Sequence, residues 1–276
     1  MSDKKGRIIV VTSGKGGVGK SSVTGNLGAA LAFSGKSVII ADMDMGLRNM
    51  DIILNAEKEI VFNIVDVVQN VCRVDQALVT SALTPNLRLL PASQLKDKDY
   101  LRDGDVYAVM ELLGEMADYV LIDCPAGIES GFRYSVGGAD EVLLVVNPEI
   151  SSLRDSDRVI ELIQDMGKDM PVSLVINRFR EDLSESGIQL PVRDVTEILP
   201  ANLVGVIPET DGICRDLRKG TFSLSSGGVS GLFMDMARRF DGEDVPMRLS
   251  CEEKAGGGAF IAAVRSLKKI FSAAAC

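Results

Sequence analysis

A glycine-rich segment between an apolar run and a helical pattern constrains the fold of this chain most strongly. The apolar run 8–11, Ile-Ile-Val-Val, leads directly into Gly-Lys-Gly-Gly-Val-Gly-Lys-Ser at 14–21, and 22–33 has the pattern of a helix. The spacing G-x-x-x-x-G-K-[ST] between a strand and a helix is typical of a loop whose backbone N–H groups surround phosphates. We therefore expect an α/β fold with a nucleoside triphosphate bound at this loop.

Two lysines in this loop have different expected roles. Lys20 should contact the β- and γ-phosphates, and the hydroxyl of Ser21 should bind Mg²⁺. Lys15 is close to the phosphates but exposed on the loop, so it could reach a phosphate bound by another subunit. An ordinary solvated lysine is the alternative for this position. The residues of this segment expected to contact nucleotide are Gly14, Lys15, Gly16, Gly17, Val18, Gly19, Lys20, Ser21 and Ser22.

Short apolar runs alternate with helical patterns along the rest of the chain. Several runs are apolar throughout, which is typical of parallel strands that are buried on both faces. This alternation predicts a doubly wound α/β fold, with a mostly parallel sheet of about seven or eight strands and helices on both faces. The predicted strands are 8–11, 38–41, 87–90, 119–122, 142–146, 172–176 and 204–207, and the predicted helices are 22–33, 63–70, 106–116, 154–166, 192–199 and 232–240.

Aspartates follow two of these strands, at the edge where open α/β sheets bind ligands. Asp123 ends an apolar strand and is the expected outer partner of Mg²⁺ in a phosphate-loop NTPase. Asp42 and Asp44 stand two residues apart on an extended chain, so their side chains project to the same side. One could reach the metal while the other orients water at the γ-phosphate. Helix capping is the alternative role for each single aspartate.

Composition excludes several other chemistries. The chain has no histidine, which removes the usual general base and most transition-metal sites. Phosphoryl transfer survives this loss because it depends mainly on positioning and electrostatics. The five cysteines have no C-x-x-C spacing, which favours a reducing cytoplasm over a disulfide framework or a zinc site. The formal net charge of −9 disfavours nucleic acid as a partner.

The chain changes character after residue 240. Residues 1–240 are predicted to form the nucleotide-hydrolysing domain, whereas 241–258 are rich in charge and glycine and predict a flexible linker. In 259–276 the apolar residues share one side of a helical wheel, which predicts an amphipathic helix lying on a membrane. A terminal helix docked on the protein's own core is the alternative. The residues expected at the membrane are Phe260, Ile261, Val264, Leu267, Lys268, Lys269, Ile270 and Phe271.

Several of these segments together resemble a known family. Residues 15–21 resemble the deviant Walker A motif of the MinD/ParA ATPases. Residues 42–51 and 123–129 are similar to one branch of that family, the regulators of the bacterial division site, and separate it from the chromosome-partitioning and iron–sulfur-carrier branches. The likeness runs nearly end to end, because it also covers 147–149, 177–178, 207–209 and 237–239.

The resemblance implies roles for individual residues in ATP hydrolysis. It implies that Lys15 contacts nucleotide across an ATP-sandwich homodimer and that Asp44 positions the attacking water. Lys20 and Ser21 would hold phosphate and Mg²⁺, and Asp42 and Asp123 would serve the metal site. The residues implied at the adenine are Asn177, Arg178, Pro208 and Glu209.

The resemblance also implies partners and a location. In this family, ATP-driven dimerisation brings the C-terminal helix to the anionic membrane surface, and the dimer recruits a MinC-like division inhibitor and, where present, a MinE-like activator. The expected location is the cytoplasm and, peripherally, the inner membrane. Two other functions stay open, a flagellar-number regulator with a similar nucleotide site and tail, and a ParA-type DNA-partitioning ATPase, which the acidic composition disfavours.

Overall fold

The computed structural model describes residues 5–45, 49–94, 103–125, 127, 130–167, 170–210 and 228–248. These residues form one eight-stranded sheet with the order β3-β4-β2-β5-β1-β6-β7-β8. β3 pairs antiparallel with β4, and the other pairings are parallel. The prediction of a doubly wound, mostly parallel sheet is therefore confirmed.

Seven of the strands coincide with the predicted apolar runs to within a few residues. The eighth strand, β3, was not predicted, because it is only two residues long and has no apolar run. The strands are β1 (Arg7–Thr12), β2 (Val38–Asp42), β3 (Val79–Thr80), β4 (Leu87–Leu90), β5 (Tyr119–Asp123), β6 (Glu141–Val146), β7 (Val172–Phe179) and β8 (Asn202–Pro208).

The predicted helices are also present in the described residues. They are α1 (Lys20–Phe33), α3 (Ile64–Val68), α5 (Asp103–Met116), α7 (Ile150–Asp165), α9 (Val192–Ile198) and α11 (Gly228–Phe240). The helices that were not predicted are α2 (Met50–Ile53), η1 (Glu57–Glu59), α4 (Val74–Ala77), α6 (Ser130–Gly137) and α8 (Glu181–Glu185). These five are short, so they show too few turns for an apolar period. Among the described residues, none of the helices has the length and hydropathy needed to cross a bilayer.

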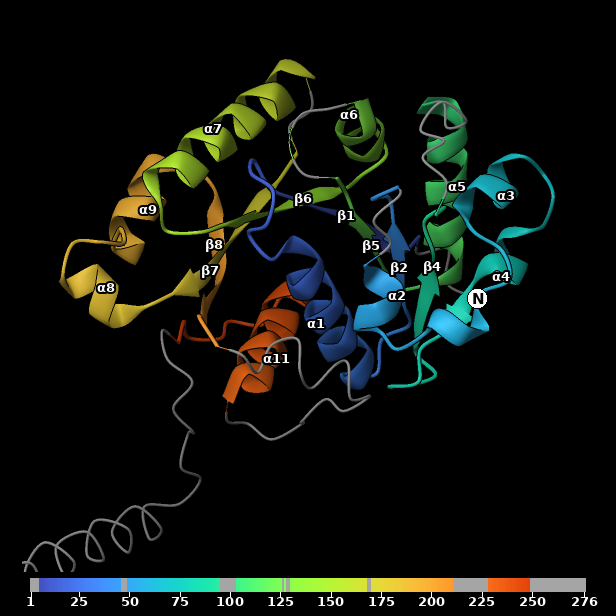
Figure 1. Ribbon diagram of the computed structural model, residues 1–276, viewed down its shortest axis with the longest axis horizontal. Coiled ribbons are helices and arrows are strands. Elements are labelled where there is room, and N and C mark those ends of the chain that lie inside the picture. Colours follow the sequence, from blue (N-terminus) through green and yellow to red (C-terminus); the bar gives the residue numbers. More distant parts are fainter. Residues whose placement is uncertain are drawn as a thin grey trace, which may run out of the picture.

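The sheet separates two hydrophobic cores. Ile8 and Val10 of β1 pack with residues of α5 and α7, while Ile9 and Val11 pack with residues of α1 and α11. Figure 1 shows α5, α6 and α7 on one side of the sheet and α1 and α11 on the other. Both faces of the central strands are therefore covered, which explains why these strands are apolar throughout.

The chain continues past α11 into a short strap, which we define as residues 241–248. Arg239 of α11 donates hydrogen bonds to the carbonyl oxygens of Val204, Val245 and Pro246, at 2.9, 2.9 and 2.6 Å. Arg248 forms an ion pair with Asp235 of α11. The first eight residues of the predicted linker thus contact the domain, whereas 249–258 and the predicted membrane helix 259–276 lie outside the described residues.

Candidate nucleotide site

The glycine-rich loop joins β1 to α1 at the carboxyl-terminal edge of the sheet. Gly19 has φ +92° and Gly17 has φ +79°, a left-handed conformation that other residues rarely adopt. A Cβ atom on Gly14 would lie 2.3 Å from the carbonyl carbon of Asp155 in α7, and one on Gly19 would lie 2.4 Å from Nδ2 of Asn177. The neighbouring elements therefore hold the loop in a shape that requires glycine. Since α1 begins at Lys20, its N-terminal N–H groups are at the site, where they favour a bound anion.

Lys20 and Asp123 form a buried ion pair in this site. Nζ of Lys20 lies 2.6 Å from Oδ1 of Asp123, and the two side chains are 7% and 1% exposed. Burial by itself lowers the pKa of Lys20, but the charge of Asp123 and its hydrogen bond outweigh burial and raise that pKa. Lys20 is therefore a permanent cation. The residue predicted to contact phosphate and the residue predicted to contact Mg²⁺ lie next to each other.

Asp42 is a second buried carboxylate beside this pair. It lies opposite Asp123 in the register of β2 and β5. Burial and the negative charge of Asp123 raise the pKa of Asp42 to about 8. Two buried carboxyl groups thus lie beside one lysine, and Asp42 holds a proton at neutral pH that a bound cation would displace, which leaves oxygen ligands in excess of the positive charge. Hard oxygen ligands in that arrangement fit a divalent cation such as Mg²⁺.

Mg²⁺ sites of this kind use few protein ligands. In the described part of the chain, no group of three or more acidic or cysteine side chains is arranged to hold a metal ion. Mg²⁺ is commonly held by one or two carboxylates together with phosphate oxygens and water, so Asp42 and Asp123 would suffice for a metal that binds together with nucleotide. Ser21, half-buried in the first turn of α1, is in the expected position to contribute its hydroxyl.

Asn177 links the end of β7 to the loop. Its Nδ2 donates a hydrogen bond of 2.7 Å to the carbonyl oxygen of Val18. The side chain is 3% exposed, and its Oδ1 has no partner among the described residues. The next residue, Arg178, is exposed and has a left-handed φ of +56°. At the end of β8, Pro208 is half-buried and Glu209 is exposed.

Lys15 is exposed beside the first turn of α7. Its Nζ lies 3.2 Å from Oγ of Ser151 and 3.7 Å from Oε2 of Glu149, and its side chain is 46% exposed. It differs in this respect from Lys20, which is enclosed by its own subunit. Asp44 follows β2 and is half-buried, and its N–H donates to Oδ1 of Asp42 at 2.9 Å.

Sequence reasoning did not identify Thr24 as part of the site. Its Oγ1 donates to Asp123 at 3.2 Å and lies 3.0 Å from the carbonyl oxygen of Lys20. The available signal was its position one turn after Lys20, on the buried face of α1. Buried side-chain oxygens without a partner in the described residues also occur at Thr12, the last residue of β1, at Asn147, just after β6, and at Ser156 in α7. Residues 46–48, 126 and 128–129 of the family motifs lie outside the described residues.

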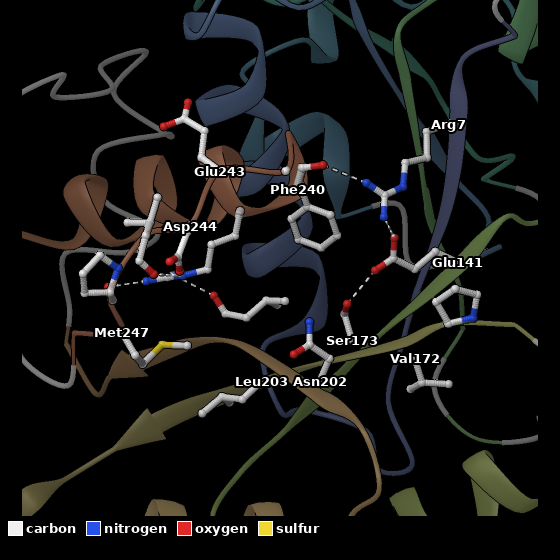
Figure 2. A pocket seen from close by; sticks show the side chains of 16 residues that line it. Arg7, Glu141, Val172, Ser173, Asn202, Leu203, Phe240, Glu243, Asp244 and Met247 are labelled. Atoms are coloured by element: carbon white, nitrogen blue, oxygen red, sulfur yellow. Dashed lines mark hydrogen bonds and ion pairs between the residues drawn. The ribbon is translucent and has the colours of Figure 1, made fainter.

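A separate pocket of about 610 Å³ lies at the opposite edge of the sheet (Figure 2). Arg7, Glu141, Val172 and Asn202, which line it, are the first residues of β1, β6, β7 and β8. Glu141 is ion-paired with Arg7 and accepts a hydrogen bond of 2.5 Å from Ser173. This pocket is therefore as far from the glycine-rich loop as the length of the strands allows.

Comparison with known proteins identifies the family. The model of the CobQ/CobB/MinD/ParA nucleotide binding domain matches residues 9–224. The septum site-determining protein MinD of Synechocystis is 44% identical over 247 residues, which cover 87% of this chain and 91% of that protein. MinD of Helicobacter pylori is 43% identical over 272 residues, which cover 96% and 99%. This chain belongs to the MinD family.

Solved structures of MinD proteins share the fold. The MinC:MinD cell division protein complex of Aquifex aeolicus gives a TM-score of 0.80 at 39% identity, covering 88% of this chain and 98% of that chain. MinD of Pyrococcus horikoshii, complexed with Mg-ADP, gives a TM-score of 0.74 at 27% identity, covering 85% and 96%. The MinD-family chain described here is therefore a nucleotide-binding ATPase, and the prediction of an adenine nucleotide with Mg²⁺ agrees with the ligand of that relative.

Proposed function

We propose that this chain is a septum site-determining ATPase that changes between a monomer in the cytoplasm and an ATP-bound homodimer on the inner membrane. The observation that carries this proposal is the different placement of the two loop lysines. Lys20 is buried against Asp123 within its own subunit, whereas Lys15 is exposed next to α7. An exposed lysine beside the phosphates can contact nucleotide held by a second copy of the chain.

Within each subunit the loop and Lys20 bind the phosphates. Lys20 is already a cation at the site, held by Asp123, so phosphate oxygens compete with one carboxylate for a lysine that needs no change of protonation. Ser21, Asp42 and Asp123 would hold Mg²⁺, which neutralises phosphate charge when it is bound. Asp44 would orient the water that attacks the γ-phosphate. Lys15 of the partner subunit would stabilise the charge that develops during transfer.

Asn177 supports adenine as the base. Its buried Oδ1 is an acceptor without a partner in the described residues, while its Nδ2 is already used by the loop. The exocyclic amino group of adenine is a donor and would satisfy this oxygen, whereas the corresponding O6 of guanine is an acceptor and would repel it. Arg178, Pro208 and Glu209, at the ends of β7 and β8, would flank the base.

The C-terminal segment would connect nucleotide state to the membrane. Residues 259–276 have an amphipathic pattern with three basic residues, each of which contributes about 1 kcal/mol near anionic lipid. One such helix binds weakly and reversibly. Two helices in a dimer make the second insertion intramolecular, which raises avidity by a factor on the order of 10²–10⁴. The dimer would then recruit a MinC-like inhibitor and, where one is encoded, a MinE-like activator.

Co-sedimentation with vesicles of phosphatidylglycerol and phosphatidylcholine tests this proposal. We expect binding that requires ATP and the anionic lipid, falls with salt, and is lost when 259–276 are deleted although ATP still induces dimers. Lys15→Ala should bind ATP as a monomer but should neither dimerise nor bind vesicles, whereas Lys20→Ala should lose nucleotide affinity itself. Equal vesicle binding with ADP and ATP, or a stable Lys15→Ala dimer in Mg²⁺-ATP, would refute the proposed switch.

A further inference from the structure

We propose that Asp42 is a positioning residue for Asp44, because its carboxylate holds both ends of the segment that carries Asp44. Oδ1 of Asp42 accepts the N–H of Asp44 at 2.9 Å, and Oδ2 accepts the N–H of Met50 at 3.4 Å. The inference rests on the proposed role of Asp44 in orienting water. It gives Asp42 a task that is separate from a contribution to the metal site.

The base of this arrangement is rigid. Asp42 is the last residue of β2, a central strand that pairs with β4 on one side and β5 on the other. The following N–H, of Met43, donates to the carbonyl oxygen of Asp123 at 2.9 Å. The carboxylate therefore extends from a backbone position that is paired with Asp123 of β5 and follows the last pair of β2 with β4, at Ala41, and it is 1% exposed.

The far end of the segment is anchored through the same carboxylate. Met50 is the first residue of α2, so its N–H has no partner within the helix. Asp42 supplies that partner, and the side chains of Met50 and Leu54 are fully buried in the core that contains α1. One side chain thus joins the end of β2, the backbone of Asp44 and the start of α2.

A carboxylate is the group that this geometry requires. Both of its oxygens accept hydrogen bonds, whereas an amide of the same shape has one acceptor and one NH₂ donor. Asp42→Asn therefore keeps one of the two contacts and turns the other into a contact between two donors. The backbone of Asp44 should then sample several positions, and a misplacement of about 1 Å in a group that orients a reactant costs roughly 10²-fold in rate.

The experiment is a double-mutant cycle on ATP hydrolysis. Asp42→Asn, Asp44→Ala and the double variant are compared with the parent for kcat, for KM of ATP and for the Mg²⁺ concentration at half-maximal rate. We expect Asp42→Asn to lower kcat at saturating Mg²⁺ roughly 10²-fold and to change KM of ATP less than about threefold. A raised Mg²⁺ requirement would report the contribution of Asp42 to the metal site and would not restore kcat. In the Asp44→Ala background, Asp42→Asn should cause no further loss of kcat, because its effect passes through Asp44.

Two outcomes would overturn the inference. One is a raised Mg²⁺ requirement with kcat recovered at saturating Mg²⁺, which is the result expected of a metal ligand alone. The other is a further loss of kcat from Asp42→Asn when Asp44 is already alanine. Failure of the proposed function would look different, since Asp44→Ala itself would then hydrolyse ATP at the parental rate.

Thermal unfolding checks the fold of each variant. If Asp42→Asn does not fold, Asp42→Ser, which also lacks one of the two acceptor oxygens, should show the same loss of kcat.

Discussion

The two edges of the sheet both bury charged groups, but they satisfy them to different degrees. At the amino-terminal edge, Glu141 is paired with Arg7 and Ser173 (Figure 2), and the guanidinium of Arg239 donates to three backbone carbonyl oxygens. At the carboxyl-terminal edge, two carboxylates face one lysine. Thr12, Asn147 and Asn177, at or near the ends of β1, β6 and β7, have buried side-chain oxygens without a partner within the described residues, as does Ser156 in α7.

This difference separates a structural cluster from a functional one. A buried polar group without a partner costs stability, so most proteins leave few of them. At the amino-terminal edge the fold itself pairs Glu141 with Arg7 and satisfies the N–H groups of Arg239, whose hydrogen bonds hold the strap 241–248. At the carboxyl-terminal edge the fold leaves buried side-chain oxygens without partners, as expected where a nucleotide and a cation bind.

The largest effect that would sharpen this comparison is expected at Asp44. Asp44→Ala should bind ATP about as tightly as the parent and should hydrolyse it more slowly by a factor of roughly 10²–10⁴, because a group that orients water is removed. Single-turnover hydrolysis measures the rate, and the fraction of dimer in Mg²⁺-ATP should rise. A parental single-turnover rate would show that Asp44 does not orient the water.

The second effect concerns stability at the opposite edge. Arg7→Ala removes the partner of the buried Glu141 and should lower the free energy of unfolding by about 2–4 kcal/mol, while the affinity for ATP stays unchanged. Urea unfolding measures the loss. Lys5→Ala is the matched control, because the pair of Lys5 with Glu111, 3.3 Å apart, is exposed and should contribute little. Equal losses in the two variants would remove the distinction between the edges.

The third effect is a pH dependence of stability in protein free of metal and nucleotide. Burial and the charge of Asp123 raise the pKa of Asp42 to about 8 in the folded protein, from its ordinary value of 3.8. Between these two pH values the folded state keeps a proton on Asp42 that the unfolded state has released. Parent stability should therefore fall as the pH rises from about 4 to 8, by on the order of 1 kcal/mol per pH unit from this group. Asp42→Asn lacks this slope.

Urea unfolding of both proteins at pH 5 and pH 8 checks that expectation. The stability of Asp42→Asn relative to the parent should be greater at pH 8 than at pH 5, and the difference between the two pH values isolates Asp42 from the other titrating groups. If the relative stability does not change with pH, Asp42 is ionised in the native protein, with its negative charge balanced by Lys20.

The smallest effect is expected for base selection at Asn177. Asn177→Ser removes the unpartnered Oδ1 and should reduce the preference for ATP over GTP by about tenfold, which corresponds to about one hydrogen bond. Competition binding with the two nucleotides measures this ratio. Arg178→Ser, at the exposed neighbouring position, is the control and should leave the ratio nearly unchanged. If Asn177→Ser leaves the preference for ATP over GTP unchanged, other residues recognise the base.

Much of the fold could be predicted from the sequence, and the exceptions share a cause. The strands β1, β2 and β5 are apolar on both faces because they lie in the centre of the sheet, so their sequences identify them. The edge strand β3 and the short helices α2 and α4 contain too few residues to show a period. Their conformations depend on contacts with elements far away in the sequence.

The site shows the same division. The glycine-rich loop was recognisable because the phosphate-binding function demands a local sequence, and the aspartates were recognisable because they end apolar strands. The contact of Lys20 with Asp123, 103 residues later, and the contact of Asn177 with Val18, 159 residues earlier, have no local signal. They exist because parallel pairing brings the ends of β1, β5 and β7 to one edge.

The sequence by itself predicted the chemistry of this protein, namely which residues would bind phosphate, coordinate a cation and orient water. The tertiary structure decided which of them meet and which charges stay unbalanced. Periodicity and motif spacing report only on neighbours along the chain, whereas the pKa of Asp42 and the open acceptor of Asn177 depend on groups that the sheet brings together. Burial then strengthens the electrostatic interactions between these neighbouring groups, because a charge removed from water is screened less.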